Sequence, residues 1–443
     1  MVIFKKEKKL AINPLKVSQP LGGVLALQGL FRTMPIVHGS QGCAAFIKAL
    51  MTQHFREPIS LQTTALQEMN IIFGAEQSMV EALDIVIEKH TPSIIAVLST
   101  ALTETAGDDL NGNIKNYKKD RCQDDCFIFP VTLPDFEGSL ESGYRLTVEA
   151  LVKELIHSSK AQLPMKKVKN QVNLLPSAHL TPGDVMELKR IISSFGLEVI
   201  TAPDLSTSLG GALAKGFSPI TRGGATFDQL QRLLSSEMTI AVGASMEGAA
   251  KALGQFAEIP YKMFNSLSGL KANDEFFSFL QHLSGKPVPQ TYRWERDNLL
   301  DCMLDAHFYF SGKKIVAALE PDHLYSIIEL CKEMGGKMAG LVTTFSTPLL
   351  SEIEEEIIIG DLDDLEKMAA DADLWISNSH GEQGSSRMKI PFLPMGFPIF
   401  HQIGSSLATS IGYRGTTELI IKMSNLLIEE SGKIHDESRI CYR

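Results

Sequence analysis

The strongest constraint on the fold is the alternation of short apolar, β-branched runs with amphipathic stretches of helical length. Apolar runs of this kind are typical of parallel strands that are buried on both faces, and the amphipathic stretches are typical of covering helices. The predicted strands are Ile94–Leu98, Phe127–Val131, Val172–Leu175, Glu198–Ile200, Thr239–Val242, Ile315–Ala318 and Leu374–Ile376. The predicted helices are Glu76–Lys89, Leu140–Ser158, Thr181–Phe195, Phe227–Ser235, Asp322–Met334 and Asp363–Ala370. The pattern therefore predicts an α/β protein with parallel sheets flanked by helices.

Two breaks in this pattern indicate the domain organisation. A chain of 443 residues is too long for one ordinary hydrophobic core. A polar stretch at 159–170 and a proline-rich stretch at 284–290 interrupt the alternation. We therefore expect three Rossmann-like domains, 1–160, 161–288 and 289–443, the last of them ending in a closing helix.

Charge and composition exclude several classes of function. The net charge is −10, from 52 acidic and 42 basic residues, which disfavours nucleic acid as the main partner. No apolar run approaches the ~18 residues of a membrane span, and the charged start lacks the apolar core of a secretory signal. We therefore expect a cytoplasmic protein.

The usual nucleotide and hydrolase motifs are missing. There is no GxxxxGK[ST], no GxGxxG after a strand, no HExxH and no GxSxG. The sequence accordingly offers no residue that we assign as catalytic, and it favours a partner in a larger assembly whose energy source lies elsewhere.

The six cysteines do not form a disulfide framework or a zinc pattern. Cys122 and Cys126 are spaced so that a helix would let them share a metal, but their segment has the composition of a loop. Cys302 and Cys331 fall on apolar-patterned helices and are expected in the core, and Cys441 lies in the terminal tail. Any metal role must therefore rest on a single cysteine whose fellow ligands come from elsewhere.

The segment from His38 to Cys43, His-Gly-Ser-Gln-Gly-Cys, is the part of the chain most suited to metal chemistry. Gly39 and Gly42 allow a tight turn and a close approach of the backbone, and a helical pattern follows at once. Cys43 then lies near a helix N-terminus, where the aligned peptide dipoles favour the metal-binding thiolate. His38 would orient this turn or simply bond to nearby backbone. The alternative for Cys43 is a small buried residue at a tight turn.

Further short motifs occur along nearly the whole chain, on both sides of the His38–Cys43 segment. In order, they are Ser18-Gln-Pro-Leu-Gly-Gly, His38–Cys43, His54–Pro58, Ile72-Phe-Gly74, Ser99–Asp109, Gly285–Pro289, Glu295-Arg296, Gly312-Lys313, Gly396–Phe400 and Gly412–Gly415. Together they resemble the nitrogenase component 1 family, in particular its β-type subunits. That family includes catalytic reductases and the scaffolds on which the iron–molybdenum cofactor is assembled.

The departures from the family pattern favour a scaffold. The resemblance places the three cysteines that hold an eight-iron cluster in the catalytic β subunit at positions 18, 43 and 101. Here Ser18 and Ala101 replace two of them, and Asp135 stands where a serine ligand of the oxidised cluster is found. The resemblance thus implies one thiolate, from Cys43, to a [4Fe–4S] cluster shared with a partner subunit.

Further expectations follow from the resemblance. The partner is a NifE-like α subunit in an α2β2 heterotetramer, which mainly holds the cofactor precursor, and the nitrogenase Fe protein is a transient electron donor. Phe73 and Gly74, in an apolar turn between a strand and a helix, would contact that donor, and His38 and Gly42 would line the cluster. Two alternatives stay open. One is a catalytic subunit of nitrogenase or of the dark protochlorophyllide reductase, and the other is a cluster-free structural partner.

Overall fold

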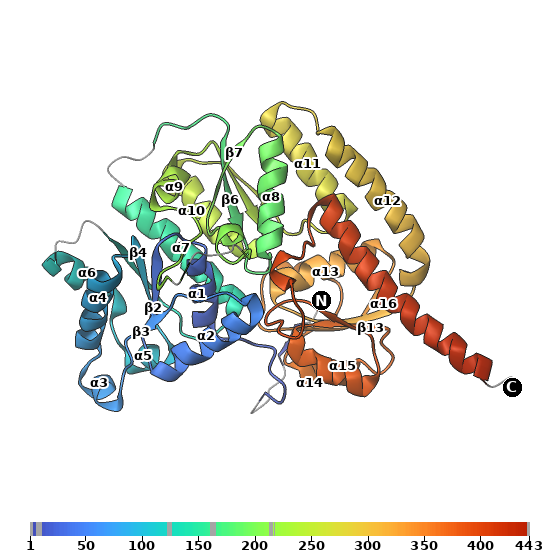
Figure 1. The fold of residues 1–443 in the computed structure, drawn as a ribbon, viewed down its shortest axis with the longest axis horizontal. Helices are drawn as coiled ribbons and strands as arrows, with labels where there is room; N and C mark the ends of the chain where they lie inside the picture. The colour runs from blue at the N-terminus through green and yellow to red at the C-terminus, as the bar shows by residue number, and fades with distance from the viewer. Residues whose placement is uncertain are drawn as a thin grey trace. The chain divides into compact units, whose positions relative to one another are not determined.

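The computed structural model describes residues 3–5, 11–121, 126–159, 165–211, 216 and 218–440. These residues form two compact units (Figure 1). One comprises residues 17–263 with 405–407, and the other comprises the described residues up to Lys16, 264–404 and 408 onward. The expected domain boundaries after residues 160 and 288 stay predictions. No helix among the described residues has the length and hydropathy needed to cross a membrane.

The unit that begins at Val17 contains two four-stranded sheets, in which the pairings of β3-β2-β4-β5 and of β7-β6-β8 are parallel. The first has the order β3-β2-β4-β5 and the second the order β7-β6-β8-β9. The strands are β2 Thr33–Val37, β3 Gln62–Thr63, β4 Ile94–Leu98, β5 Phe127–Val131, β6 Gln171–Pro176, β7 Glu198–Thr201, β8 Met238–Val242 and β9 Tyr261–Phe264. The helices are α1 Gln19–Gln28, α2 Gln41–Phe55, α3 Glu68–Phe73, α4 Glu76–His90, α5 Ala101–Ala106, α6 Leu110–Arg121, α7 Leu140–Ser159, α8 Pro182–Ser194, α9 Phe227–Arg232 and α10 Glu247–Ala257.

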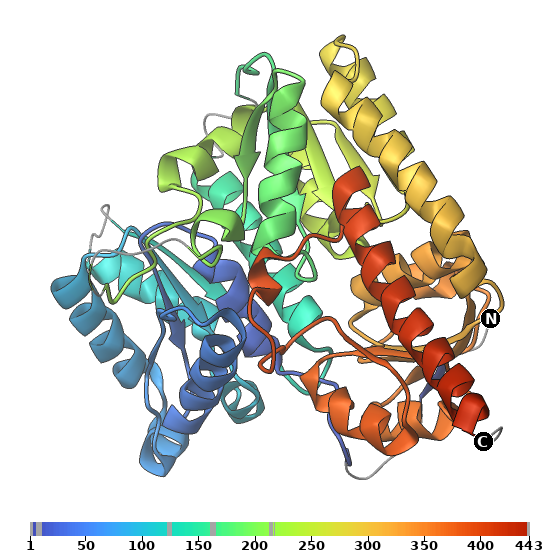
Figure 2. The ribbon, with the colours of Figure 1, turned by 45° about the vertical axis from the view of Figure 1, so that its right-hand side comes forward.

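The other unit contains one six-stranded sheet of order β1-β12-β11-β10-β13-β14, with every pairing parallel. Its strands are β1 Ile3–Lys5, β10 Lys314–Ala318, β11 Lys337–Thr343, β12 Ile357–Ile359, β13 Leu374–Ser377 and β14 Phe392–Pro394. Its helices are α11 Leu270–Ser284, α12 Gln290–Phe310, α13 Pro321–Glu333, α14 Leu362–Met368, α15 Glu382–Met388 and α16 Gly412–Ile440. The long closing helix α16 packs along α12, as both ribbon views show (Figures 1 and 2).

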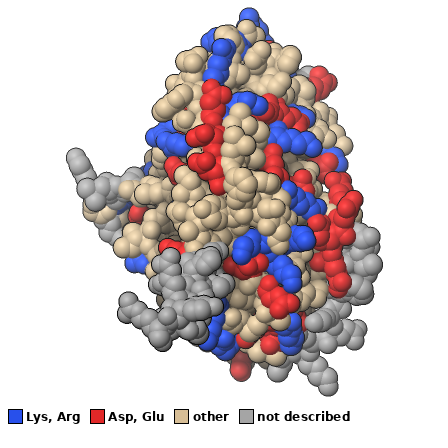
Figure 3. All heavy atoms as spheres, turned by 90° about the vertical axis from the view of Figure 1, so that its right-hand side faces the viewer, with Lys and Arg blue, Asp and Glu red and all other residues tan. Residues whose placement is uncertain are grey.

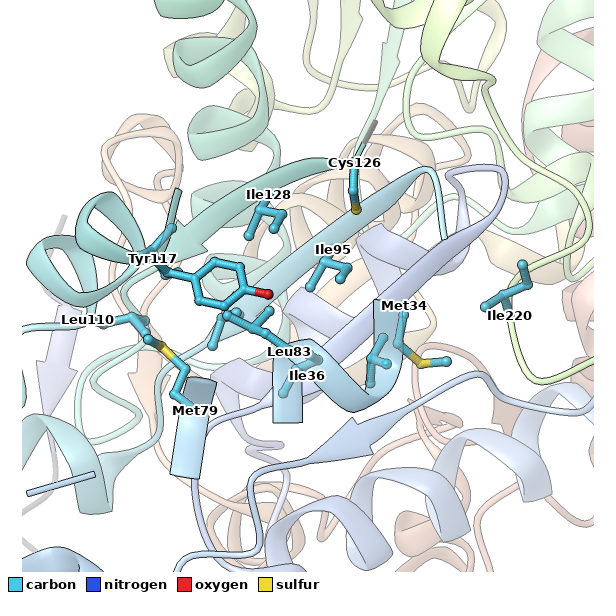
Figure 4. Packing of buried hydrophobic residues seen from close by; sticks show 13 residues of the cluster. Met34, Ile36, Met79, Leu83, Ile95, Leu110, Tyr117, Cys126, Ile128 and Ile220 are labelled. Atoms are coloured by element: carbon cyan, nitrogen blue, oxygen red, sulfur yellow. The ribbon is translucent and has the colours of Figure 1, made fainter. Parts of the chain in front are cut away.

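The first sheet owes its stability to burial on both faces. Along β2 and β4 all residues are buried, and alternate side chains point to opposite faces. On one face Met34, Ile36, Ile95 and other strand residues pack against α4 and α6, with Cys126 in the same cluster (Figure 4). Burying each aliphatic side chain of this size contributes about 1.5–3 kcal/mol. Cys126 is thus a buried core residue, and the alternative of a metal shared with Cys122 stays untested because Cys122 lies outside the described residues.

On the opposite face α1 and α7 pack against each other at very close range. A Cβ on Gly22 would lie 1.9 Å from the Leu140 carbonyl oxygen, and one on Gly143 would lie 2.0 Å from the Gln19 carbonyl oxygen. Only glycine fits at such separations, so these two residues set how closely the helix backbones approach. The N-terminal end of α1 is thereby held next to the segment that precedes α7.

Charged side chains on the surface are mixed in sign. On the face drawn in Figure 3, basic and acidic residues are interspersed around stretches of other residues. This face offers no broad basic area of the kind that binds nucleic acid, which agrees with the net charge of −10.

Candidate functional site

The site lies where three neighbouring strands of the first sheet end. Because β2, β4 and β5 are parallel, their carboxyl ends meet at one edge of the sheet. Backbone bonds continue past the strands, with His38 N–H donating to the Leu98 carbonyl at 2.8 Å and Ser99 N–H donating to the Val131 carbonyl at 3.0 Å. The segments that follow lead into α2, α5 and α7, so the fold brings positions 43, 101 and 135 to the same edge.

Cys43 is the third residue of α2, which confirms the expected position in the first turn of a helix. Ser40 stands at the N-cap with extended backbone, but its side chain makes no capping bond; its hydroxyl oxygen lies 3.5 Å from the Cys43 sulfur. The N–H groups of Gln41, Gly42 and Cys43 find no acceptor among the described residues. The thiol is half-buried and unoxidised. This helix start therefore presents a thiol and three free donors, a suitable arrangement for an electron-rich sulfur group.

The two glycines of the turn differ in how closely their neighbours approach, and Gly39 makes the close approach that was expected. Neither adopts left-handed backbone, so conformational freedom is not what selects glycine at these positions. A Cβ on Gly39 would lie 2.8 Å from the Thr100 hydroxyl, which makes Gly39 a close contact with the start of α5. A Cβ on Gly42 would meet nothing nearer than the Ser40 hydroxyl at 3.8 Å, and Gly42 is exposed. The chain's own packing does not require glycine at position 42, and the missing side chain leaves room for a group outside the chain.

His38 is fully buried and holds the turn from several directions. Its Nε2 lies 2.8 Å from Asp108 Oδ2, and its Nδ1 lies 3.1 Å from Thr64 Oγ1. The His38 carbonyl accepts hydrogen bonds from the hydroxyls of Thr100 and Thr103 at 3.0 and 3.3 Å. Burial lowers the pKa of the imidazole, and the hydrogen bond and charge of Asp108 partly offset that effect. A neutral imidazole that donates to Asp108 and accepts from Thr64 satisfies both ring nitrogens.

Asp135 is engaged with the start of α1. Its Oδ1 accepts a hydrogen bond from Gln19 N–H at 2.7 Å, and its own N–H donates to Gln19 Oε1 at 2.9 Å. Gln19 Nε2 then donates to the Ser142 hydroxyl at 2.9 Å. Asp135 holds left-handed backbone with φ of 61°, which Asp tolerates better than most residues. Ser18 is the half-buried N-cap of α1, and Ala101 is the half-buried first residue of α5.

Gly74 lies between two helices rather than between a strand and a helix, so that part of the expectation was wrong. Phe73 is the last residue of α3, and its side chain lies outside the described residues. Gly74 has φ of 106° and open space around it. Ile72 and Met69 of α3 are 72% and 63% exposed. A hollow of about 360 Å³ adjoins this turn, and its lining includes Glu76, Asp108 and Asp109 and no basic residue.

The described residues place no other cysteine in a metal-binding group with Cys43. Cys126 and Cys331 are buried, and burial raises the pKa of each thiol to about 12, well above the range in which thiolate forms. Cys302 is half-buried beside a groove between α12 and α16, so the expectation of a core position was wrong for it. Cys122 and Cys441 lie outside the described residues.

The described residues contain one group of three His, Cys, Asp or Glu side chains at metal-binding separation, namely Asp361, Asp363 and Asp364. Two of these carboxylates form the capping box of α14. Within the part of the chain that the structure describes, Cys43 belongs to no such group. A metal centre at Cys43 would need further ligands from outside the described residues.

Comparisons with known proteins agree with the motifs. The model of the nitrogenase component 1 type oxidoreductases matches residues 18–428. The nitrogenase iron-molybdenum cofactor biosynthesis proteins NifN of Rippkaea orientalis and of a Nostoc strain are each 41% identical to this chain, over 97% of it and 96% of their own lengths. NifN of Bradyrhizobium diazoefficiens is 39% identical, over 95% of this chain and 90% of its own length.

A solved structure supports the fold assignment. A chain of nitrogenase Cp1 at pH 6.5 is 28% identical and superposes with a TM-score of 0.88, over 96% of this chain and 95% of that chain. The predicted α/β fold with parallel sheets flanked by helices is thus confirmed. Fold and sequence comparisons point to the same group of proteins.

Proposed function

Because this chain belongs to the nitrogenase component 1 type oxidoreductase family, we propose that it is the β-like subunit of a scaffold complex for the nitrogenase iron–molybdenum cofactor. On that complex a precursor of the cofactor is held, mainly by the partner subunit, and matured. The near full-length similarity to NifN proteins supports this choice over a catalytic subunit. Ser18 and Ala101 support it as well, because neither can supply the thiolate that a catalytic β subunit would need.

The observation that carries the proposal is the start of α2. The Cys43 thiol, three unbonded N–H groups and the absent side chain of Gly42 come together on an accessible surface. Thiolate is the usual ligand of iron–sulfur clusters, and N–H donors stabilise their sulfurs. These residues fit one corner of a [4Fe–4S] cluster, which when bound would relay electrons. The chain's own part is to supply one thiolate, to orient it through the turn that His38 anchors, and to leave space at Gly42.

Three further thiolates are required for a [4Fe–4S] cluster, and the described part of this chain does not place them near Cys43. We therefore assign them to a NifE-like α subunit that faces α2. Phe46, one turn after Cys43, is 62% exposed on this helix. An exposed aromatic beside a shared ligand is suited to burial in a subunit interface.

The turn at Gly74 is the proposed docking site for the Fe protein. Exposed Ile72 and Met69 provide apolar contact area, and the adjoining hollow is lined by the carboxylates of Glu76, Asp108 and Asp109. A cationic side chain of the electron donor would be attracted to such a hollow. No site in the chain is assigned to ATP, so nucleotide hydrolysis stays with the donor.

The test is anaerobic copurification of this chain with its partner, comparing wild type, Cys43→Ala and Cys302→Ala. Cys302→Ala is the matched control, because Cys302 is likewise half-buried and unoxidised. We expect Cys43→Ala to lose the iron and the electron paramagnetic resonance signal of one [4Fe–4S] cluster while the heterotetramer stays intact. Cys302→Ala should keep both.

An unchanged iron count and spectrum in Cys43→Ala would mean that Cys43 is structural. The scaffold role would then lack a cluster ligand from this subunit. Loss of iron from both variants would point to damaged folding instead of a lost ligand.

A further inference from the structure

Ser40, the residue that precedes α2, does not use its hydroxyl to cap the helix, and neither does Ser18 at the start of α1. A serine at an N-cap normally accepts a bond from the N–H two or three residues further on. Thr181 and Thr226, at the starts of α8 and α9, do this with the N–H groups of Asp184 and Gln229. Ser40 does not, and its hydroxyl oxygen lies 3.5 Å from the Cys43 sulfur instead.

The direction of that bond follows from the chemistry of the sulfur. In the free thiol either group can be the donor. A thiolate bound to iron carries no proton, so only the Ser40 hydroxyl can donate, with the sulfur as acceptor. A hydrogen bond of this kind withdraws electron density from the ligand and makes the cluster easier to reduce.

We propose that Ser40 is a positioning residue that directs a hydroxyl hydrogen bond to the Cys43 sulfur and thereby raises the reduction potential of the cluster, an inference that rests on the proposed function. The local structure favours this use of the hydroxyl. Gly42 adds no side chain beside Ser40 Oγ, and the N–H groups of Gln41, Gly42 and Cys43 stay available to the sulfurs of the same cluster.

The test measures potential and stability together in the copurified complex under anaerobic conditions. Ser40→Ala removes the hydroxyl, Ser40→Thr restores one, and Thr181→Ala is the matched control because its hydroxyl does cap a helix. We expect Ser40→Ala to keep its iron and its melting temperature while the midpoint potential shifts to more negative values. Ser40→Thr should return the potential to that of wild type. Thr181→Ala should lower the melting temperature of the complex and leave the potential unchanged.

A midpoint potential in Ser40→Ala equal to that of wild type would overturn the proposal, whatever happens to the melting temperature. If Ser40→Ala does not assemble, Ser40→Gly provides the same test, because glycine suits an N-cap and also lacks the hydroxyl. Loss of iron in both would show that Ser40 is needed for folding of the turn, and would also overturn the proposal. Failure of the proposed function is a separate result, since it would appear as iron retained in Cys43→Ala.

Discussion

The contact between Asp135 and α1 gives a quantitative prediction about how the site is built. Asp135 stands at a position where the family resemblance raised the question of a metal ligand, yet its carboxylate accepts the Gln19 N–H at 2.7 Å. Gln19 is only 3% exposed, so no water replaces that acceptor readily. Asp135→Ala should therefore leave the first N–H of α1 buried and unbonded, whereas Asp135→Asn keeps an acceptor oxygen at the same place.

The size of the effect follows from two contributions. A hydrogen bond to a charged group contributes about 1.5–3 kcal/mol, and the lower half applies because Asp135 is partly exposed. Position 135 has left-handed backbone with φ of 61°, and placing alanine there costs about 1 kcal/mol more than Asp or Asn, which tolerate this region better. Asp135→Ala should thus weaken the anchoring of α1 by about 3 kcal/mol, and Asp135→Asn by less than about 1 kcal/mol, the difference between a charged and a neutral acceptor.

Hydrogen exchange of the α1 amides measures this anchoring directly. Since 1.4 kcal/mol is a factor of ten, Asp135→Ala should speed exchange about 100-fold, and Asp135→Asn less than about fivefold. Equal exchange in the two variants would refute the capping argument. Loss of iron from the copurified complex in Asp135→Asn, with α1 exchange unchanged, would instead show that the carboxylate serves the cluster.

Other predictions follow from the same geometry. Gly42→Ala should leave the isolated chain as stable as wild type or stabilise it by up to about 1 kcal/mol in urea unfolding, because alanine suits a helix. The iron bound by the copurified complex should fall, because the added methyl group takes up space beside Cys43. Unchanged iron would show that nothing approaches Gly42. Burial lowers the pKa of His323 from 6.5 to about 4, so the unfolded chain takes up a proton first as pH falls. The contribution of neutral His323 to the free energy of unfolding is complete above pH 6.5 and should decline by about 3 kcal/mol on acidification to pH 4. Urea titrations at several pH values should find a weaker pH dependence of the unfolding free energy in His323→Leu. Glu76→Lys should slow electron transfer from the Fe protein in stopped-flow mixing, because it places a positive charge at the hollow. Glu88→Lys, at the far end of α4, should not change the rate. Equal rates in wild type and both variants would argue against docking at the Gly74 turn.

Periodicity in the sequence was enough to place much of the fold. All seven predicted strands are present, because fully buried parallel strands form continuous apolar runs. Strand β2, which leads directly into the site, was not predicted. Its centre is Pro35, and proline within a central strand argues against a strand assignment. Strands β3 and β12, of two and three residues, are too short to show a period.

Only those features of the site that depend on residues close together in the sequence could be predicted. Cys43 in the first turn of a helix follows from the glycine-rich segment and the helical pattern after it. The partner of His38 does not, because Asp108 is 70 residues away and is brought close by the parallel pairing of β2 with β4. The bond between Asp135 and Gln19 joins residues 116 apart and likewise depends on how α1 packs on α7.

The four positions that the family resemblance singles out, 18, 43, 101 and 135, differ in the hydrogen bonds made by the helix starts beside them. At α1 the first N–H is bonded to Asp135, and Pro20, next in the helix, has no N–H to offer. At α5 the hydroxyls of Thr100 and Thr103 bond to the chain's own backbone, and Ala101 has no donor or ligand atom in its side chain. At α2 the thiol and three N–H groups are all unbonded to backbone. Among these helix starts, α2 is thus the one that combines a thiol with three N–H groups that have no acceptor among the described residues. This asymmetry is expected if one subunit supplies a single corner of a cluster and its partner supplies the rest.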